Sequence, residues 1–204
     1  MYSLGNYFKV VLIGDSGCGK TSMSNRYNFN NFNTNVASTM GSEFKTIPFF
    51  TPNNKELSLH IWDTAGQERF RSFVRIYFKD AFAIIFVFDL TNMNSLQNIE
   101  MWYREYKNSA PDESKTFIFL VGNKADMIDK AVDNHDLITA YINKYKFIYF
   151  ETSAKSGANI RELFDKIKEK ACKYYDHNDS FDKSMSLHIK LEDGQKKTSC
   201  CYLF

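Results

Sequence analysis

Residues 14–21 constrain the fold of this chain more than any other stretch. They read Gly-Asp-Ser-Gly-Cys-Gly-Lys-Thr, which has the spacing G-x-x-x-x-G-K-T, and they follow the apolar run 8–13. Glycines allow a sharp turn that brings backbone N–H groups close to an anion, and a helix over residues 20 to about 29 adds its positive dipole end. We expect Lys20 to reach terminal phosphates and the Thr21 hydroxyl to ligate Mg²⁺. The pattern therefore predicts a phosphate-binding loop, and a glycine-rich turn without a ligand is the weaker alternative.

The composition places few further limits on the class of protein. The chain has 204 residues and a formal charge of only +2, so it lacks the strongly basic balance typical of nucleic-acid binding. No apolar run approaches the ~20 residues that span a bilayer, and the N-terminus does not resemble a signal peptide. The four cysteines and four histidines show no metal-ligand spacing. We therefore expect a protein of the cytosolic side without a zinc site.

Alternating strand-like and helix-like segments predict an α/β fold. Strands are expected at residues 8–13, 43–51, 57–62, 84–89, 116–122 and 147–151. Pro48 and Pro52 place the second strand at an edge, and the turn at Asn53 and Asn54 makes its pairing with the third strand antiparallel. Helices are expected after the phosphate loop, after Asn94, over residues 133–144 and from residue 160. The prediction is a three-layer fold of the P-loop NTPase type, with a six-stranded, mostly parallel sheet, one antiparallel edge strand and flanking helices.

The composition changes near residue 176. The stretch that follows is polar, mixed in charge and poor in apolar residues, so disorder is expected there. The predicted organisation is one domain over residues 1–175 and a flexible tail over residues 176–204.

A second signature closes the third strand, where residues 61–68 read Ile-Trp-Asp-Thr-Ala-Gly-Gln-Glu. A carboxylate at a strand end beside the phosphate loop can hold Mg²⁺, and we assign this role to Asp63. Gly66 can offer its backbone N–H to a γ-phosphate, and Gln67 can position an attacking water. Residues 61–68 alone are compatible with a simple turn, but together with the phosphate loop they predict hydrolysis of a nucleoside triphosphate.

Two further motifs follow the fifth and sixth strands, at residues 123–126 (Asn-Lys-Ala-Asp) and 151–155 (Glu-Thr-Ser-Ala-Lys). Asp126 can accept hydrogen bonds from N1–H and the N2 amine of guanine, donors that adenine does not present. The stem of Lys124 can lie over the base, and the Ala154 N–H can donate to O6. Each motif alone is no more than a solvated turn, but in this order they predict a guanine site at the carboxyl edge of the sheet.

The four motifs together resemble those of the Ras superfamily of small GTPases over roughly residues 6–174. Within the superfamily the chain is most similar to the Rab family, on the stretches Ser-Thr-Met-Gly-Ser-Glu-Phe-Lys at 38–45 and Trp-Asp-Thr-Ala-Gly-Gln-Glu-Arg-Phe-Arg at 62–71 and on the double cysteine near the C-terminus. The resemblance implies that Thr39 is a switch threonine that ligates Mg²⁺ in the GTP state, and that Phe32 packs against the guanine. Residues ~30–44 and ~64–78 would be the two switches.

The resemblance, with the motifs, assigns the following sites. The expected GTP-binding residues are Asp15, Ser16, Gly17, Cys18, Gly19, Lys20, Thr21, Ser22, Phe32, Thr39, Gly66, Asn123, Lys124, Asp126, Ser153, Ala154 and Lys155. The expected Mg²⁺ ligands are Thr21, Thr39 and Asp63, and the expected catalytic groups are Gln67, Lys20 and Gly66. Phe44, Trp62 and Tyr77 match an aromatic triad that Rab proteins present to effectors, although core packing explains them equally well from the residues alone.

The chain ends Ser-Cys-Cys-Tyr-Leu-Phe, with Cys200 and Cys201 near its end. Such an end fits a prenylation pattern biased to geranylgeranyl, and in Rab-like proteins both cysteines take a lipid. An unmodified pair of thiols is the alternative.

The sequence as a whole predicts a GTP/GDP switch in vesicle trafficking that hydrolyses GTP and acts on the cytoplasmic face of an endomembrane. The expected cofactor is Mg²⁺, and the expected partners are effectors, an exchange factor, an activating protein, a GDP-dissociation inhibitor and a prenylation escort. We expect a monomer that does not bind nucleic acid. The sequence leaves two alternatives: a GTP-dependent binding module without useful hydrolysis and an ATP-using enzyme with the same loop.

Overall fold

The computed structural model describes residues 6–34, 39, 42–65, 71–109, 116–130 and 135–194. The chain divides into two compact units, residues 1–167 and residues 168–204. The first unit contains the sheet and every residue of the candidate site that the structure describes.

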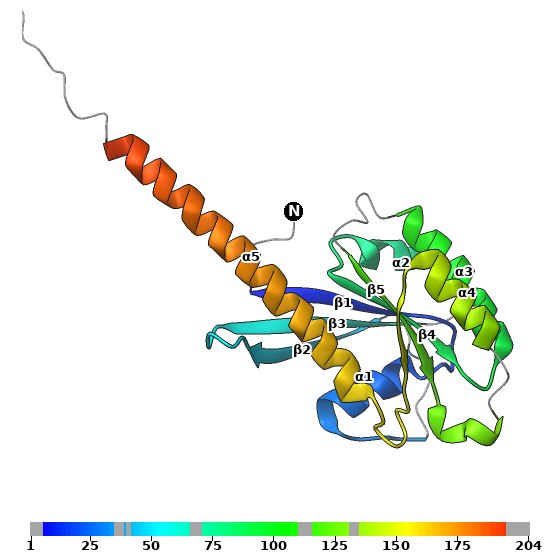
Figure 1. The fold of residues 1–204 in the computed structure, drawn as a ribbon. Coiled ribbons are helices and arrows are strands. Elements are labelled where there is room, and N and C mark those ends of the chain that lie inside the picture. Colours follow the sequence, from blue (N-terminus) through cyan, green and yellow to red (C-terminus); the bar gives the residue numbers. More distant parts are fainter. Residues whose placement is uncertain are drawn as a thin grey trace, which may run out of the picture. The chain divides into compact units, whose positions relative to one another are not determined.

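A six-stranded sheet forms the centre of the first unit, in the order β2-β3-β1-β4-β5-β6 (Figure 1). The strands are β1 (Tyr7–Ile13), β2 (Ser42–Phe50), β3 (Glu56–Thr64), β4 (Ala83–Asp89), β5 (Phe117–Asn123) and β6 (Ile148–Glu151). Only the β2–β3 pair is antiparallel among these strands, and the other four pairs are parallel. All six strands were predicted from the sequence, with the edge position of β2 that Pro48 indicated.

The helices are α1 (Lys20–Phe29), α2 (Arg71–Phe78), α3 (Met93–Lys107), η3 (Ala125–Lys130), α4 (His135–Tyr145) and α5 (Ile160–Gly194). In Figure 1, α3 and α4 lie side by side against one face of the sheet. On the other face, Tyr27 of α1 stacks on Phe164 in the first turns of α5, with ring centroids 4.0 Å apart. The result is the three-layer arrangement expected from the alternating segments.

Buried side chains on both faces of β4 hold the layers together. Every residue of β4 is buried, because helices cover both faces of this central parallel strand. On the side of α3, Trp102 and Tyr106 are buried against Phe86 of β4. On the side of α5, Leu163 and Phe164 are fully buried. The helical spacing of these apolar residues in the sequence therefore reflects core packing.

Two helices differ from the expectation. The 3-10 helix η3 begins inside the base-site motif, at Ala125, and was not predicted, because its six residues are too few to show a hydrophobic period. Helix α5 continues to Gly194, whereas disorder was expected from about residue 176. No proline interrupts residues 160–194 and the helix ends at its first glycine, so the local propensities permit this length. The division into a domain over residues 1–175 and a tail remains a prediction.

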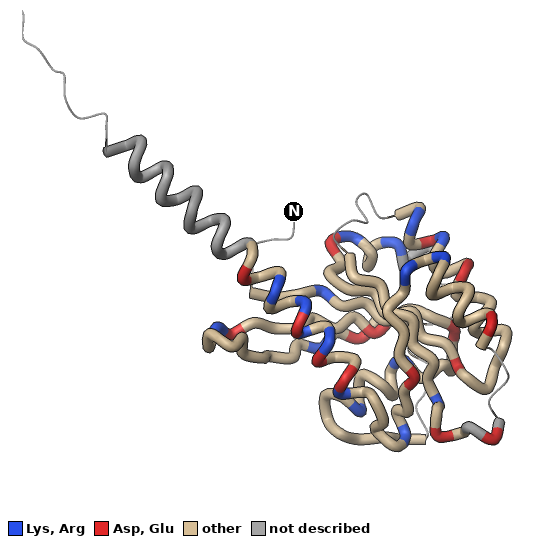
Figure 2. The backbone as a smooth tube through the Cα atoms, in the orientation of Figure 1, with Lys and Arg blue, Asp and Glu red and all other residues tan. Residues whose placement is uncertain are grey.

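Acidic and basic side chains are interspersed over the described part of the chain, as the small net charge suggests (Figure 2). Within this part, no helix is both long enough and apolar enough to cross a membrane.

Candidate functional site

The loop between β1 and α1 is shaped by backbone that only glycine adopts easily. Gly14 has φ of 145°, and a Cβ there would meet the backbone of Val87 on β4. Gly19 has φ of 91° and immediately precedes α1, so the helix begins from a left-handed residue. Lys20 folds back over this loop, and its Nζ donates to the carbonyl oxygens of Gly14 and Asp15 at 2.7 Å each. Burial lowers the pKa of Lys20, and nearby anionic groups oppose this effect. A buried ammonium at the start of a helix is the arrangement that a polyphosphate requires.

Asp15 is held by helix α3 and its side chain is not among the groups that line the cavity. Its carboxylate accepts from Asn98 Nδ2 at 2.7 Å and from Trp102 Nε1 at 2.8 Å. The phosphate loop is thereby attached to α3 through two side-chain hydrogen bonds to one charged group. Asp15 therefore contributes to the cavity through its backbone carbonyl, which accepts a hydrogen bond from Lys20 Nζ.

Asp63 lies at the end of β3 and provides a test of whether a cation fits. Its side chain is 0% exposed, and neither carboxylate oxygen has a hydrogen-bond partner among the described residues. Burial raises the pKa of this carboxyl, while Thr21, Lys20 and Lys45 oppose the increase. A buried, unpaired carboxylate is costly unless a cation compensates it.

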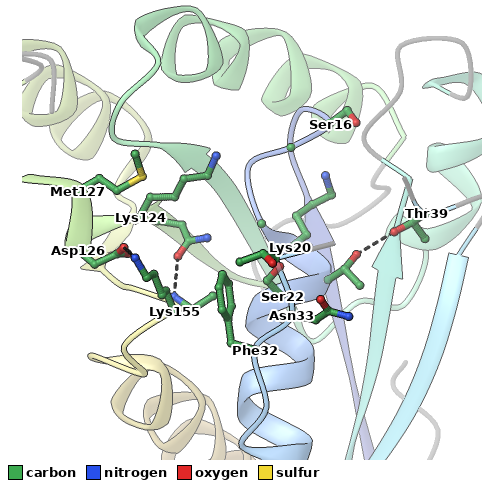
Figure 3. Close-up of a pocket in the computed structure, with 16 residues that line it drawn as sticks. Ser16, Lys20, Ser22, Phe32, Asn33, Thr39, Lys124, Asp126, Met127 and Lys155 are labelled. Carbon is green, nitrogen blue, oxygen red and sulfur yellow. Dashed lines mark hydrogen bonds and ion pairs between the residues drawn. The ribbon is translucent and has the colours of Figure 1, made fainter. Parts of the chain in front are cut away.

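Hydroxyl groups complete this part of the site. Thr21 Oγ1 and Thr39 Oγ1 lie 2.8 Å apart, joined by a hydrogen bond (Figure 3). The described residues include no group of three or more His, Cys, Asp and Glu that could hold a metal. The donors available are therefore one carboxylate and two hydroxyls, oxygen ligands that suit Mg²⁺ shared with substrate phosphates. The residues fit the cation that the sequence predicted.

Asn123 joins the phosphate loop to the base-site loops. Its Nδ2 donates to the Cys18 carbonyl at 2.8 Å, and its Oδ1 accepts from the Thr152 hydroxyl at 3.3 Å and from the Ala154 N–H at 3.1 Å. The Ala154 N–H is therefore already engaged, and a purine O6 would have to share it. Asn123 itself is buried, so these bonds fix the relative position of three loops.

Lys124, directly after β5, and Asp126, in the first turn of η3, both line the cavity. Asp126 Oδ1 accepts from the Ser153 hydroxyl at 2.5 Å, and Lys155 Nζ is 3.9 Å from Oδ2. Lys124 has φ of 70°, and its Nζ lies 2.6 Å from Asp89 Oδ2. Among the described residues, the second carboxylate oxygen of Asp126, Oδ2, has only this distant partner, so it can accept from a base.

These loops enclose one cavity of about 460 Å³ (Figure 3). It is lined by Ser16, Gly17, Gly19, Lys20, Thr21, Ser22, Phe32, Asn33, Thr34, Thr39, Asn123, Lys124, Asp126, Met127, Ala154 and Lys155. Phe32 reaches the base end of the cavity from the segment after α1. The structure thus brings together residues from four separate segments that the motifs assigned to a nucleotide site.

Some assignments differ in detail from this lining. Asp15, Cys18 and Ser153 do not line the cavity, and they act on its walls through hydrogen bonds instead. Asn33, Thr34 and Met127 line it without having been predicted. The first two follow Phe32 inside the segment expected to be the first switch, and Met127 follows the base-site motif directly, so proximity in sequence was the available signal. Gly66, Gln67, Cys200 and Cys201 lie outside the described residues.

The aromatic triad brings together side chains from β2, β3 and α2. Phe44 is 47% exposed, and its ring centroid is 5.0 Å from that of Trp62, which is 5.4 Å from that of Tyr77. Trp62 and Tyr77 also pack against the core, which is one of the two functions that the sequence left open. The use of the triad as an effector surface stays a prediction. The Tyr77 hydroxyl shares a 2.8 Å hydrogen bond with Ser42 Oγ, which connects α2 to β2.

Comparisons with known proteins agree with this geometry. The model of the Ras family matches residues 9–173. Human Ras-related protein Rab-8B is 42% identical over 157 residues, which is 77% of this chain and 74% of the relative. The GTP-binding protein ypt1 of Schizosaccharomyces pombe is 33% identical over 198 residues, or 95% of this chain and 96% of the relative. Rat Ras-related protein Rab-13 is 39% identical over 160 residues, or 78% and 77%.

The cavity, the sheet and these matches define one class, the P-loop GTPases that hydrolyse GTP. The chain belongs to the Ras family and, within it, to the Rab group of small GTPases.

Proposed function

We propose that this protein is a membrane-anchored guanine-nucleotide switch that binds GTP with Mg²⁺, hydrolyses it to GDP and recruits effectors of vesicle trafficking in the GTP state. The observation that carries the proposal is the cavity in which the phosphate loop, Thr39, Asp126 and the loop of Ala154 and Lys155 meet. A nucleoside diphosphate or triphosphate matches the order of these groups, with phosphates at Lys20 and the base at Asp126.

Several residues are expected to contribute to hydrolysis, each in a different way. Lys20 and the backbone N–H groups of the loop stabilise charge on the terminal phosphates, and Gln67 orients the attacking water. Asp63, Thr21 and Thr39 would hold Mg²⁺, which neutralises phosphate charge when it is bound. No arginine was identified from the sequence as an internal finger, so full rate is expected to require an activating protein.

The switch itself is expected to lie in the segments around residues 30–44 and 64–78. Thr39 can contact the γ-phosphate only while that phosphate is present, so hydrolysis removes one of the interactions that order the first segment. Phe44 and Tyr77 of the aromatic triad fall within these two segments, and Trp62 packs against both of their rings. Phe44 is 47% exposed, which supports the use of the triad as the effector surface.

Membrane attachment is proposed through Cys200 and Cys201. Two lipid groups provide the two signals that stable anchoring requires, and a GDP-dissociation inhibitor would return the protein to the cytosol. Mass spectrometry of the C-terminal peptide from cells should show geranylgeranyl groups on both cysteines, and an unmodified peptide would contradict the anchor. Neither result bears on nucleotide hydrolysis.

Single-turnover hydrolysis of GTP tests the catalytic part. The Gln67→Leu variant should bind GTP as the wild-type protein does and hydrolyse it at least about 10-fold more slowly, since it cannot orient the water. Equal rates for the two proteins would remove Gln67 from the mechanism.

A further inference from the structure

Arg26, in the last turn of α1, connects that helix to the loop after β6. Its Nε donates to the Ala154 carbonyl at 2.8 Å, and its Nη2 donates to the Lys155 carbonyl at 2.6 Å. The third nitrogen, Nη1, donates to the Asn30 carbonyl at 3.0 Å. One planar guanidinium thus holds two successive carbonyl groups more than 120 residues away in sequence, a task for which its fork of donors is suited.

These two carbonyl groups belong to the segment that lines the base end of the cavity. Because the peptide unit is planar and trans, the Lys155 N–H points away from the Ala154 carbonyl and therefore away from the guanidinium. The Lys155 N–H has no acceptor among the described residues, whereas the Ala154 N–H donates to Asn123 Oδ1 at 3.1 Å. Fixing the Ala154 carbonyl therefore fixes the direction of a free N–H donor beside the base end of the cavity.

A simpler explanation is that Arg26 only stabilises the end of α1. It is a basic residue in the last turn, and its guanidinium and backbone carbonyl both contact Asn30, which has φ of 49°. A helix end of this kind commonly recruits a cation. This explanation accounts for the contact with Asn30 but not for the two hydrogen bonds to the carbonyls of Ala154 and Lys155.

We propose that Arg26 is a positioning residue for guanine recognition, which orients the peptide between Ala154 and Lys155 so that its N–H donates to O6 of the base. The inference rests on the proposed function, since it requires a guanine nucleotide in the cavity. Arg26 does not touch the nucleotide in this account, and its effect on binding passes through the backbone that it holds.

Three nucleotides separate this function from a purely structural one. GDP and inosine diphosphate both carry O6, and they differ in the N2 amine that faces Asp126. The diphosphate of 2-aminopurine riboside keeps the amine but lacks O6 and the N1 proton, so its overall affinity is lower. The informative quantity is the ratio of dissociation constants, variant over wild type, measured for each nucleotide by competition with a fluorescent GDP analogue.

For Arg26→Ala we expect GDP and inosine diphosphate to bind about 10-fold more weakly, as for a lost hydrogen bond to a buried acceptor, with a ratio near 1 for the 2-aminopurine nucleotide. Arg26→Lys should give the same selective loss, because one ammonium cannot hold both carbonyls, and it retains the charge at the helix end should Arg26→Ala fold poorly. Asn28→Ala, an exposed position two residues further along α1, is the matched control and should leave all three ratios at 1.

If Arg26→Lys weakens the binding of all three nucleotides equally, Arg26 acts only on the end of α1. If the three ratios of dissociation constants stay at 1, the loop does not depend on Arg26. Either result overturns the inference while leaving the nucleotide site intact. A wild-type protein that fails to bind GDP would instead contradict the proposed function, and with it the role of Arg26.

Discussion

Among the described residues, Asp63 has the surroundings that best fit a bound cation. Its carboxylate is buried, and neither oxygen makes a close hydrogen bond among the described residues, although the Thr21 hydroxyl lies near enough to oppose the rise of its pKa. Removing Mg²⁺ with EDTA should therefore accelerate GDP dissociation from the wild-type protein by at least about 10-fold, as is typical for the loss of about 1.4 kcal/mol of binding. Asp63→Ala should dissociate GDP rapidly with or without EDTA. The rate can be followed with a fluorescent GDP analogue, and an EDTA effect of the same size in the variant would remove Asp63 from the cation site.

Cys18 is expected to react slowly with alkylating reagents. Its side chain is 1% exposed, and burial raises the pKa of the thiol from 9.0 to about 11. At pH 8 this shift leaves roughly 100-fold less thiolate than in the unfolded chain, and thiolate is the nucleophile. Iodoacetamide should therefore alkylate Cys18 at least about 100-fold more slowly in the folded protein than in urea. Peptide mapping measures both rates, and comparable rates at pH 8 would contradict the shifted pKa.

Residue types and spacing identified most of the cavity lining but few of the residues that hold its walls. Lys20 and Asp126 were predictable because their chemistry requires a fixed position within a short motif. The hydrogen bonds of Arg26 and Asn98 could not be predicted, since their partners are 128 and 83 positions away and neither side chain belongs to a motif. Met127 likewise lines the cavity because η3 directs the backbone there, and this short helix was not predicted.

At the scale of elements, helix α3 links the phosphate loop to α2. Trp102 and Asn98 of α3 hold the Asp15 carboxylate, and Glu105 pairs with Arg75 of α2 at 2.8 Å. The Arg75–Glu105 pair is solvent-accessible, so it contributes at most about 1 kcal/mol. The bonds to Asp15 are partly buried and charge-assisted, so they dominate this connection.

Trp102→Phe tests the connection, because it removes the indole N–H while keeping an aromatic ring in the core. We expect the free energy of unfolding of the GDP-bound protein to decrease by roughly 1–3 kcal/mol and GDP dissociation to accelerate, since Asp15 loses a charge-assisted bond beside Lys20. Urea denaturation and nucleotide release measure the two effects. The control is Glu105→Ala, which removes only the exposed ion pair; an effect on GDP release as large as that of Trp102→Phe would contradict the ranking.

The elements that the sequence predicted well are those with a strong period or a continuous apolar run. Strand β4 is buried along its whole length, and its sequence is apolar except for its last residue. Helix α5 was underestimated, because its polar second half offers no hydrophobic period, although nothing in residues 160–193 terminates a helix.

At the scale of the whole molecule, the order of the motifs determined both the fold class and the location of the site. Parallel strands present their carboxyl ends at one edge of the sheet, so motifs that follow β1, β3, β5 and β6 must converge there. No motif of the sequence specifies which effectors and regulatory proteins the chain binds.

We expect the cavity to select guanine through Asp126, and competition between nucleotides measures this selectivity. The wild-type protein should retain fluorescent GDP against excess ADP, because adenine would place an acceptor opposite the carboxylate. Asp126→Asn should bind GDP at least about 100-fold more weakly and should prefer xanthosine diphosphate, whose O2 can accept from the new amide. Displacement of GDP by ADP at similar concentrations, or an Asp126→Asn variant that still prefers GDP to xanthosine diphosphate, would contradict the account.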